Sequence, residues 1–93
     1  MRAVQRDLEE GADFVMVKPI SAYLDVAYEI KQRFPYAITA CYQVSGEYAM
    51  ICNAADAGLV DKKRVVLEYM TSFTRAGIDV IITYFTPELL EWL

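Results

Sequence analysis

The residue in this chain most suited to covalent chemistry is a lysine at the end of an apolar stretch. Lys18 follows Val15-Met16-Val17, which read as a buried β-strand, and it precedes Pro19. Lysine is rarely buried, and an apolar strand end would disfavour its ammonium form by desolvation. Because a neutral amine attacks carbonyl carbon, this position suggests a Schiff-base lysine. The alternative is an ordinary strand-end lysine whose flexible stem leads the charge out to water.

A tyrosine occupies the matching position in a second, similar stretch. Residues 11–18 (GADFVMVK) align with residues 77–84 (GIDVIITY), and each stretch has a helix-ending glycine, then an aspartate, then an apolar strand. Lys18 and Tyr84 both stand seven residues after that glycine. If both units build the same kind of strand, we expect the two side chains at the same height at the carboxyl ends of the strands. Barrel and open α/β enzymes place their chemistry at that edge.

Three apolar stretches predict the strands that would position these residues: Asp13–Val17, Ala37–Gln43 and Val80–Phe85. They are continuously apolar rather than alternating, which is typical of a parallel sheet covered by helices. Helices are expected between and around them, with the N-caps Ser21, Ser45 and Asp61 and the ends Gly11, Gly58 and Gly77. The predicted class is α/β, built from successive βα units with parallel strands.

The alternation of side chains along a strand gives each residue a face. It places Lys18 on the face of Phe14 and Met16, and it turns Val15 and Val17 toward the helices. Three strands cannot close a barrel, and they would leave two unpaired edges and one uncovered apolar face. We therefore expect the chain to be part of a larger sheet.

Composition and charge exclude several classes of protein. With 56% hydrophobic and 24% charged residues, the chain is not expected to be disordered. Its net charge of −4 argues against a nucleic-acid or membrane-surface partner. It has two cysteines, Cys41 and Cys52, and no histidine, so no zinc-site spacing is recognisable and free thiols of a cytoplasmic protein are expected.

Four ordered motifs give the chain a resemblance to a known enzyme family. They are Met16-Val17-Lys18-Pro19, Ser21–Asp25 (SAYLD), Tyr42–Met50 (YQVSGEYAM) and Ile81–Pro87 (IITYFTP). Together they resemble the C-terminal part of the porphobilinogen synthase family, also called 5-aminolevulinate dehydratase, over essentially all 93 residues. The resemblance implies that residues 1–93 are a single segment of a partial (β/α)8 TIM barrel, comprising its last three strands and their helices.

The resemblance also implies roles for four side chains. Lys18 matches the lysine that forms a Schiff base with the substrate molecule that supplies the propionate side of the product. Ser45 and Tyr84 match the pair that hydrogen-bonds the carboxylate of that molecule, and Tyr42 matches a tyrosine that lines the same pocket. Considered alone, Ser45 is typical of a helix N-cap, the two tyrosines are typical of strand aromatics chosen for packing, and Glu47 is typical of a first-turn acid that answers the helix dipole.

In the family that the chain resembles, two molecules of 5-aminolevulinate condense to porphobilinogen with loss of two waters, a step of haem biosynthesis. The resemblance implies that the second lysine, the zinc cysteines and the arginines of the other substrate site precede the matched part. We therefore expect no cofactor site in this chain, zinc or magnesium in a full-length parent, and an octamer-like homo-oligomer of that parent.

Two other interpretations stay open. The 93 residues could be a truncated fragment whose exposed edges and inner face make it self-associate, without activity of its own. They could also belong to a different Schiff-base lyase on a TIM barrel, although that interpretation leaves the motif from Tyr42 to Met50 unexplained. A chain that holds only this half-site could bind one substrate molecule and still not catalyse the condensation.

Overall fold

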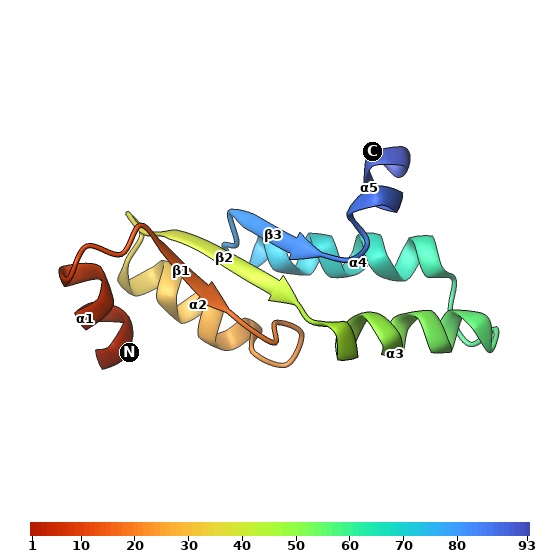
Figure 1. The fold of residues 1–93 in the computed structure, drawn as a ribbon, viewed down its shortest axis with the longest axis horizontal. Helices are drawn as coiled ribbons and strands as arrows, with labels where there is room; N and C mark the ends of the chain where they lie inside the picture. Colours follow the sequence, from red (N-terminus) through yellow and green to blue (C-terminus); the bar gives the residue numbers. More distant parts are fainter.

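The computed structural model describes residues 1–93 and contains one three-stranded sheet. The strands are β1 (Phe14–Val17), β2 (Ile38–Gln43) and β3 (Val80–Thr83), and both neighbouring pairs are parallel. The helices are α1 (Arg2–Glu9), α2 (Leu24–Arg33), α3 (Ser45–Asp56), α4 (Lys62–Arg75) and α5 (Thr86–Trp92) (Figure 1). The predicted order of elements and the parallel sheet are both confirmed.

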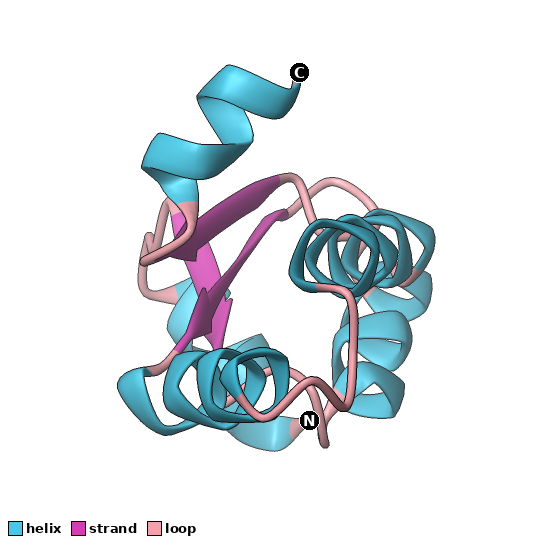
Figure 2. Cartoon of the chain, turned by 90° about the vertical axis from the view of Figure 1, so that its right-hand side faces the viewer, coloured by secondary structure: helices cyan, strands magenta, loops and turns pink.

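One face of the sheet is covered by helices, and the other is exposed to solvent. Side chains of Val17 and Cys41 join a buried cluster with Ala27 and Ile30 of α2 and Phe73 of α4. The other face carries large apolar side chains open to solvent: Phe14, Met16, Ile38, Val80 and Ile82. Figure 2 shows most of the helices gathered on one side of the strands. The predicted assignment of Val15 and Val17 to the helix-covered face is confirmed, since both belong to that cluster or pack against it.

The strands are staggered, which corrects one expectation. Phe14 pairs with Ile38, but Val80 pairs with Ala40, so the β3 unit is set two residues further along the sheet than the β1 unit. Lys18 and Tyr84 therefore do not lie at the same height, although they share the same offset from a glycine. Strands of a barrel must be staggered in this way, and an internal repeat in the sequence does not reveal the stagger.

The chain leaves β3 earlier than predicted. The strand ends at Thr83, and Tyr84 and Phe85 already lie in the turn before α5. The Phe85 N–H donates to the Thr83 hydroxyl at 3.1 Å, and the Thr86 hydroxyl donates to the Thr83 carbonyl at 2.8 Å. These local bonds take the place of the interstrand hydrogen bonds, and they direct the backbone from β3 toward the start of α5.

Helix boundaries follow the predicted signals in most places, with Ser21 as an exception. Asp61 caps α4 by accepting from the Arg64 N–H at 3.0 Å, as expected. Gly77 ends the α4 region at φ +100°, a conformation that favours glycine. Helix α2, in contrast, begins at Leu24 with Tyr23 in the cap position and no side-chain cap. The expected cap Ser21 lies in the preceding turn, where its N–H is bound by a distant carboxylate.

No helix of the chain combines the length and the apolar character that a membrane crossing requires.

Candidate active site

The four residues singled out in the sequence lie at the carboxyl edge of the sheet. Lys18 directly follows β1, Tyr42 is the second-to-last residue of β2, Ser45 opens α3, and Tyr84 directly follows β3. Parallel strands bring their carboxyl ends to one edge, so topology alone gathers these side chains from three separate stretches of sequence.

Two of the four side chains touch directly. The Tyr42 hydroxyl donates to the Tyr84 hydroxyl oxygen at 3.1 Å, across neighbouring strands. The ring of Tyr48 in α3 packs against both Tyr84 and Phe85, with ring centroids 5.4 and 4.6 Å away. The hydrogen bond to Tyr84 raises the pKa of the Tyr42 phenol above its ordinary value. The two hydroxyls are thus hydrogen-bonded to each other, and the ring of Tyr48 packs against that of Tyr84. With its pKa raised, the Tyr42 hydroxyl stays protonated at neutral pH.

The amine of Lys18 lies in water. Its side chain is exposed and makes no hydrogen bond or ion pair in the structure, so the expectation of a buried, desolvated lysine is wrong for these 93 residues. The cause is its position at the end of β1, an edge strand whose neighbouring Phe14 and Met16 are themselves exposed. Ser45 is also exposed.

Ser45 is not a helix cap. It is the first residue of α3, the cap position belongs to Val44, and no side chain at that position bonds to the helix. The alternative role that was considered for Ser45 is therefore wrong, and its hydroxyl is free of any internal partner. That hydroxyl is available to a ligand at the edge of the sheet.

A buried glutamate that the sequence suggested only as a first-turn acid is the best-connected polar side chain of this region. The Glu47 carboxylate accepts from the N–H groups of Val44 at 3.0 Å, Ser21 at 2.7 Å and Ile20 at 3.2 Å. Burial alone would raise its pKa, but these hydrogen bonds outweigh burial and lower the pKa below its ordinary value. Its place in the first helical turn is confirmed, whereas the bonds to residues 20 and 21 could not be predicted from local sequence.

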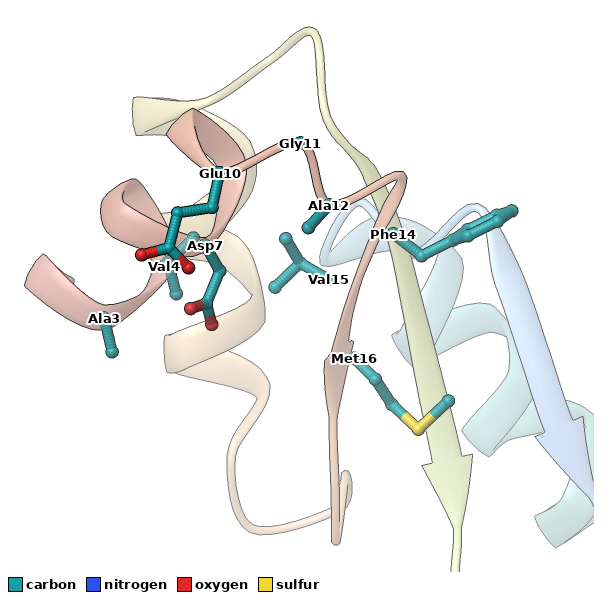
Figure 3. A pocket seen from close by; sticks show the side chains of 9 residues that line it. All are labelled: Ala3, Val4, Asp7, Glu10, Gly11, Ala12, Phe14, Val15 and Met16. Carbon is teal, nitrogen blue, oxygen red and sulfur yellow. The ribbon is translucent and has the colours of Figure 1, made fainter.

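The hollow shown in Figure 3 lies elsewhere. It has a volume of about 550 Å³ and is lined by α1, the following turn and β1, including Val4, Asp7, Val15 and Met16. None of the four candidate site residues lines it. Lys18, Ser45 and Tyr84 are all exposed, so the site at the carboxyl edge is an open surface in this chain.

The side chains present do not fit a metal centre. No three His, Cys, Asp or Glu residues come close enough together to hold an ion. Cys41 is buried, and burial, with a smaller contribution from the charge of Glu47, raises the pKa of its thiol to about 11. A thiol with that pKa is a poor metal ligand at neutral pH.

Comparison with known proteins gives consistent matches. The family described as delta-aminolevulinic acid dehydratase matches residues 1–92. Curated relatives of that name include one from Bos taurus, 57% identical over 93 residues, and one from Bacillus subtilis, 46% identical over 93 residues. Each match covers 100% of this chain and 28% of the relative, so the chain spans little more than a quarter of their length.

One solved structure is similar over nearly the whole chain. It is delta-aminolevulinic acid dehydratase (porphobilinogen synthase) from Toxoplasma gondii, in complex with the reaction product porphobilinogen. The TM-score is 0.96 at 43% sequence identity, and the match covers 99% of this chain and 26% of that protein. The three βα units therefore have the backbone arrangement of one part of that TIM-barrel enzyme.

Proposed function

Because the chain belongs to the delta-aminolevulinic acid dehydratase family, we propose that it carries the Schiff-base half of a porphobilinogen synthase site. In this proposal Lys18 binds one molecule of 5-aminolevulinate covalently, and Ser45 and Tyr84 hold the carboxylate of that molecule. The observation that carries the proposal is the gathering of these residues at one sheet edge, with the hydroxyls of Tyr42 and Tyr84 already bonded to each other.

The covalent step uses the neutral amine of Lys18 as the nucleophile. Its nitrogen forms a bond to the keto carbon, and a proton moves from nitrogen to the former carbonyl oxygen to give a carbinolamine. That hydroxyl takes up a proton from solvent and leaves as water, so the carbon–nitrogen double bond of an iminium remains. No electrons are gained or lost. The iminium withdraws electrons from the neighbouring carbons and activates the bound molecule for condensation.

The carboxylate is held by hydroxyl donors rather than by a cation. With Tyr42 donating to the Tyr84 oxygen, the proton of Tyr84 is free to point at the substrate, and a donor that itself accepts a bond is strengthened. Ser45 stands at the start of the twelve-residue helix α3, whose first backbone N–H groups also favour an anion. Neutral donors fix the carboxylate without placing a second positive charge beside the iminium.

The condensation joins two molecules, and these four side chains account for the contacts of one. The chain is therefore proposed to bind and activate a single molecule of 5-aminolevulinate. A second candidate, a chain with no covalent chemistry of its own, is favoured by one observation, the exposure of Lys18 and of the sheet face beside it. One experiment separates the two candidates.

The experiment is borohydride reduction in the presence of 5-aminolevulinate, followed by peptide mapping with mass spectrometry. A single adduct on Lys18, absent in Lys18→Arg and kept in Lys63→Arg, is expected, because Lys63 is an exposed residue of α4 and does not follow a strand of the sheet. Adducts scattered over Lys31, Lys62 and Lys63, or no adduct at all, would favour the chain without covalent chemistry.

A further inference from the structure

One carboxylate joins the two loops that hold the ends of the proposed site. Glu47 lies in the first turn of α3, and it bonds both to its own helix start and to the loop between β1 and α2. The first connection, to the Val44 N–H, is what a helix start needs, and many helices have it. The other two connections reach residues 26 and 27 positions away, and helix capping does not account for them.

The two ends of this link adjoin the reactive residues. Ile20 stands two residues after Lys18, is fully buried, and donates its N–H to Glu47. Val44 immediately precedes Ser45 and donates to the same carboxylate oxygen. The nucleophile and the carboxylate-binding hydroxyl are both exposed, so their own side chains make no contacts that fix their separation.

The Glu47 carboxylate binds backbone N–H groups and does not neutralise a cationic side chain. Glu47 is only 6% exposed, and it forms no ion pair with any lysine or arginine. A buried anion is stable only when hydrogen bonds replace its lost water, and here three backbone N–H groups do so. A neutral amide could not replace it, because glutamine offers one acceptor oxygen and turns its NH₂ toward another donor.

We propose that Glu47 is a positioning residue, which sets the spacing between the Lys18 amine and the hydroxyl of Ser45 and thereby selects γ-keto acids. The inference rests on the proposed function. In 5-aminolevulinate the keto carbon and the carboxylate are separated by two methylene groups, so a fixed distance between nucleophile and hydroxyl recognises that spacing. A keto acid with one more methylene group would place its carboxylate beyond the hydroxyls of Ser45 and Tyr84 when its keto carbon meets Lys18.

The test compares two keto acids that lack the amino group and so can be trapped but not condensed. Levulinate has the γ-keto spacing, and 5-oxohexanoate has one more methylene group. For each, the rate of reductive trapping on Lys18 at low ketone concentration is measured by peptide mapping. The wild-type chain is expected to prefer levulinate by about tenfold or more, the discrimination that a site achieves for one methylene group. In Glu47→Gln the ratio is expected to approach unity.

The control is Glu68→Gln, which changes an exposed glutamate on α4 whose carboxylate has no hydrogen-bond partner. It should keep the wild-type ratio. A role of Glu47 in stability alone would lower both trapping rates by the same factor, because the folded fraction is common to both ketones. An unchanged ratio in Glu47→Gln, with Lys18 still trapped, would overturn this inference and leave the proposed function standing. The absence of any Lys18 adduct in the wild-type chain would overturn both.

A second variant covers the case in which Glu47→Gln does not fold. Val44→Pro removes one of the three donors, and the φ of −72° at Val44 is one that proline adopts without strain. It should reduce the preference for levulinate while circular dichroism stays unchanged. A folded Val44→Pro chain that keeps the full preference would count against the proposed link.

Discussion

The Thr83 hydroxyl donates a 2.6 Å hydrogen bond to the side-chain oxygen of Gln43, and thereby ties the last residue of β3 to the last residue of β2 within the core. Gln43 is fully buried, and its NH₂ group has no partner. Each of the two residues adjoins a tyrosine of the proposed site, Tyr42 or Tyr84. The buried bond therefore holds the backbone from which the two bonded hydroxyls project.

Replacing Thr83 by valine should destabilise the chain strongly. The change keeps the shape but removes the donor to Gln43 and the acceptor of the Phe85 N–H, which leaves buried polar groups unsatisfied. We expect a loss of about 1–3 kcal/mol in the free energy of unfolding, measured by urea denaturation. Thr71→Val is the matched control, because Thr71 is exposed on α4 and bonds only to the Leu67 carbonyl. Equal losses in the two variants would contradict this account.

Losing the Tyr84 hydroxyl should weaken substrate binding more than it slows the covalent step. In Tyr84→Phe the proposed donor to the substrate carboxylate disappears, whereas the Lys18 amine is untouched. We expect the half-saturating concentration of 5-aminolevulinate in reductive trapping to rise by about tenfold, the worth of a hydrogen bond to a charged group. Tyr36→Phe, an exposed tyrosine in the turn before β2, serves as control. A fall in the maximal trapping rate with no change in half-saturation would assign Tyr84 another role.

Acid should unfold the chain partly through Glu47. The pKa of this carboxyl is lower in the folded chain than its ordinary value of about 4.3, so its ionised form stabilises the fold. That contribution is complete above the unfolded-state pKa and is lost as the pH falls through the lower, folded-state pKa. Urea midpoints measured from pH 7 down to pH 3 should fall at the acid end, and Glu47→Gln should flatten that fall.

A second carboxyl group, that of Asp79, also contributes to the loss of stability in acid. Hydrogen bonds from the Lys31 amine and the Thr39 N–H lower the pKa of Asp79 as well. The acid limb should therefore flatten only in part in Glu47→Gln, and further when Asp79→Asn is added. An acid limb identical to that of the wild-type chain in Glu47→Gln would contradict the assignment of stability to this carboxylate.

Two glycines with nearly the same backbone angle should respond differently to alanine. Gly11 has a φ of +98° and Gly77 a φ of +100°, so alanine is strained at both positions. At Gly77 an added Cβ would also lie 2.7 Å from Cγ of Lys31, whose amine bonds to Asp79 and to the Ala37 carbonyl; at Gly11 it would meet nothing within 4 Å. Gly77→Ala should therefore cost about 1 kcal/mol more than Gly11→Ala in urea denaturation. Equal costs would mean that Lys31 moves aside freely.

Sequence was a sufficient guide to most features whose signal is local. The helix and strand segments, the glycine helix ends and the Asp61 cap depend on residues close together in the sequence, and they are confirmed. The parallel pairing, predicted from the continuously apolar strands and the helices between them, is also confirmed. The family and its fold followed from ordered motifs. The gathering of site residues at one edge followed from the parallel arrangement, which leaves little choice about where strand ends meet.

The early end of β3 and the shifted cap of α3 are local errors, whereas the other errors concern relationships between distant parts of the chain. Lys18 was expected to be buried, but burial depends on what covers the neighbouring sheet face. Lys18 and Tyr84 were expected at one height, but the register of β3 against β2 is set by packing across the sheet. Ser21 was expected to cap α2, but Glu47 holds its backbone instead. None of these contacts leaves a periodic or local trace in the sequence.

The stagger of the strands gives the proposed site a direction. With about 3.3 Å of rise per strand residue, an offset of two residues sets Tyr84 roughly 7 Å beyond the level of Lys18 along the sheet. A substrate molecule that reaches from Lys18 to Tyr84 must run obliquely across the end of β2. Its keto carbon would lie at the level of Lys18, and its carboxylate would lie further along the strand direction, at the level of Tyr84. A flat imine held in that slanted pose presents two unlike faces, one toward the tyrosines and one away from them. The handedness of the sheet would then decide from which face a second molecule approaches the bound one.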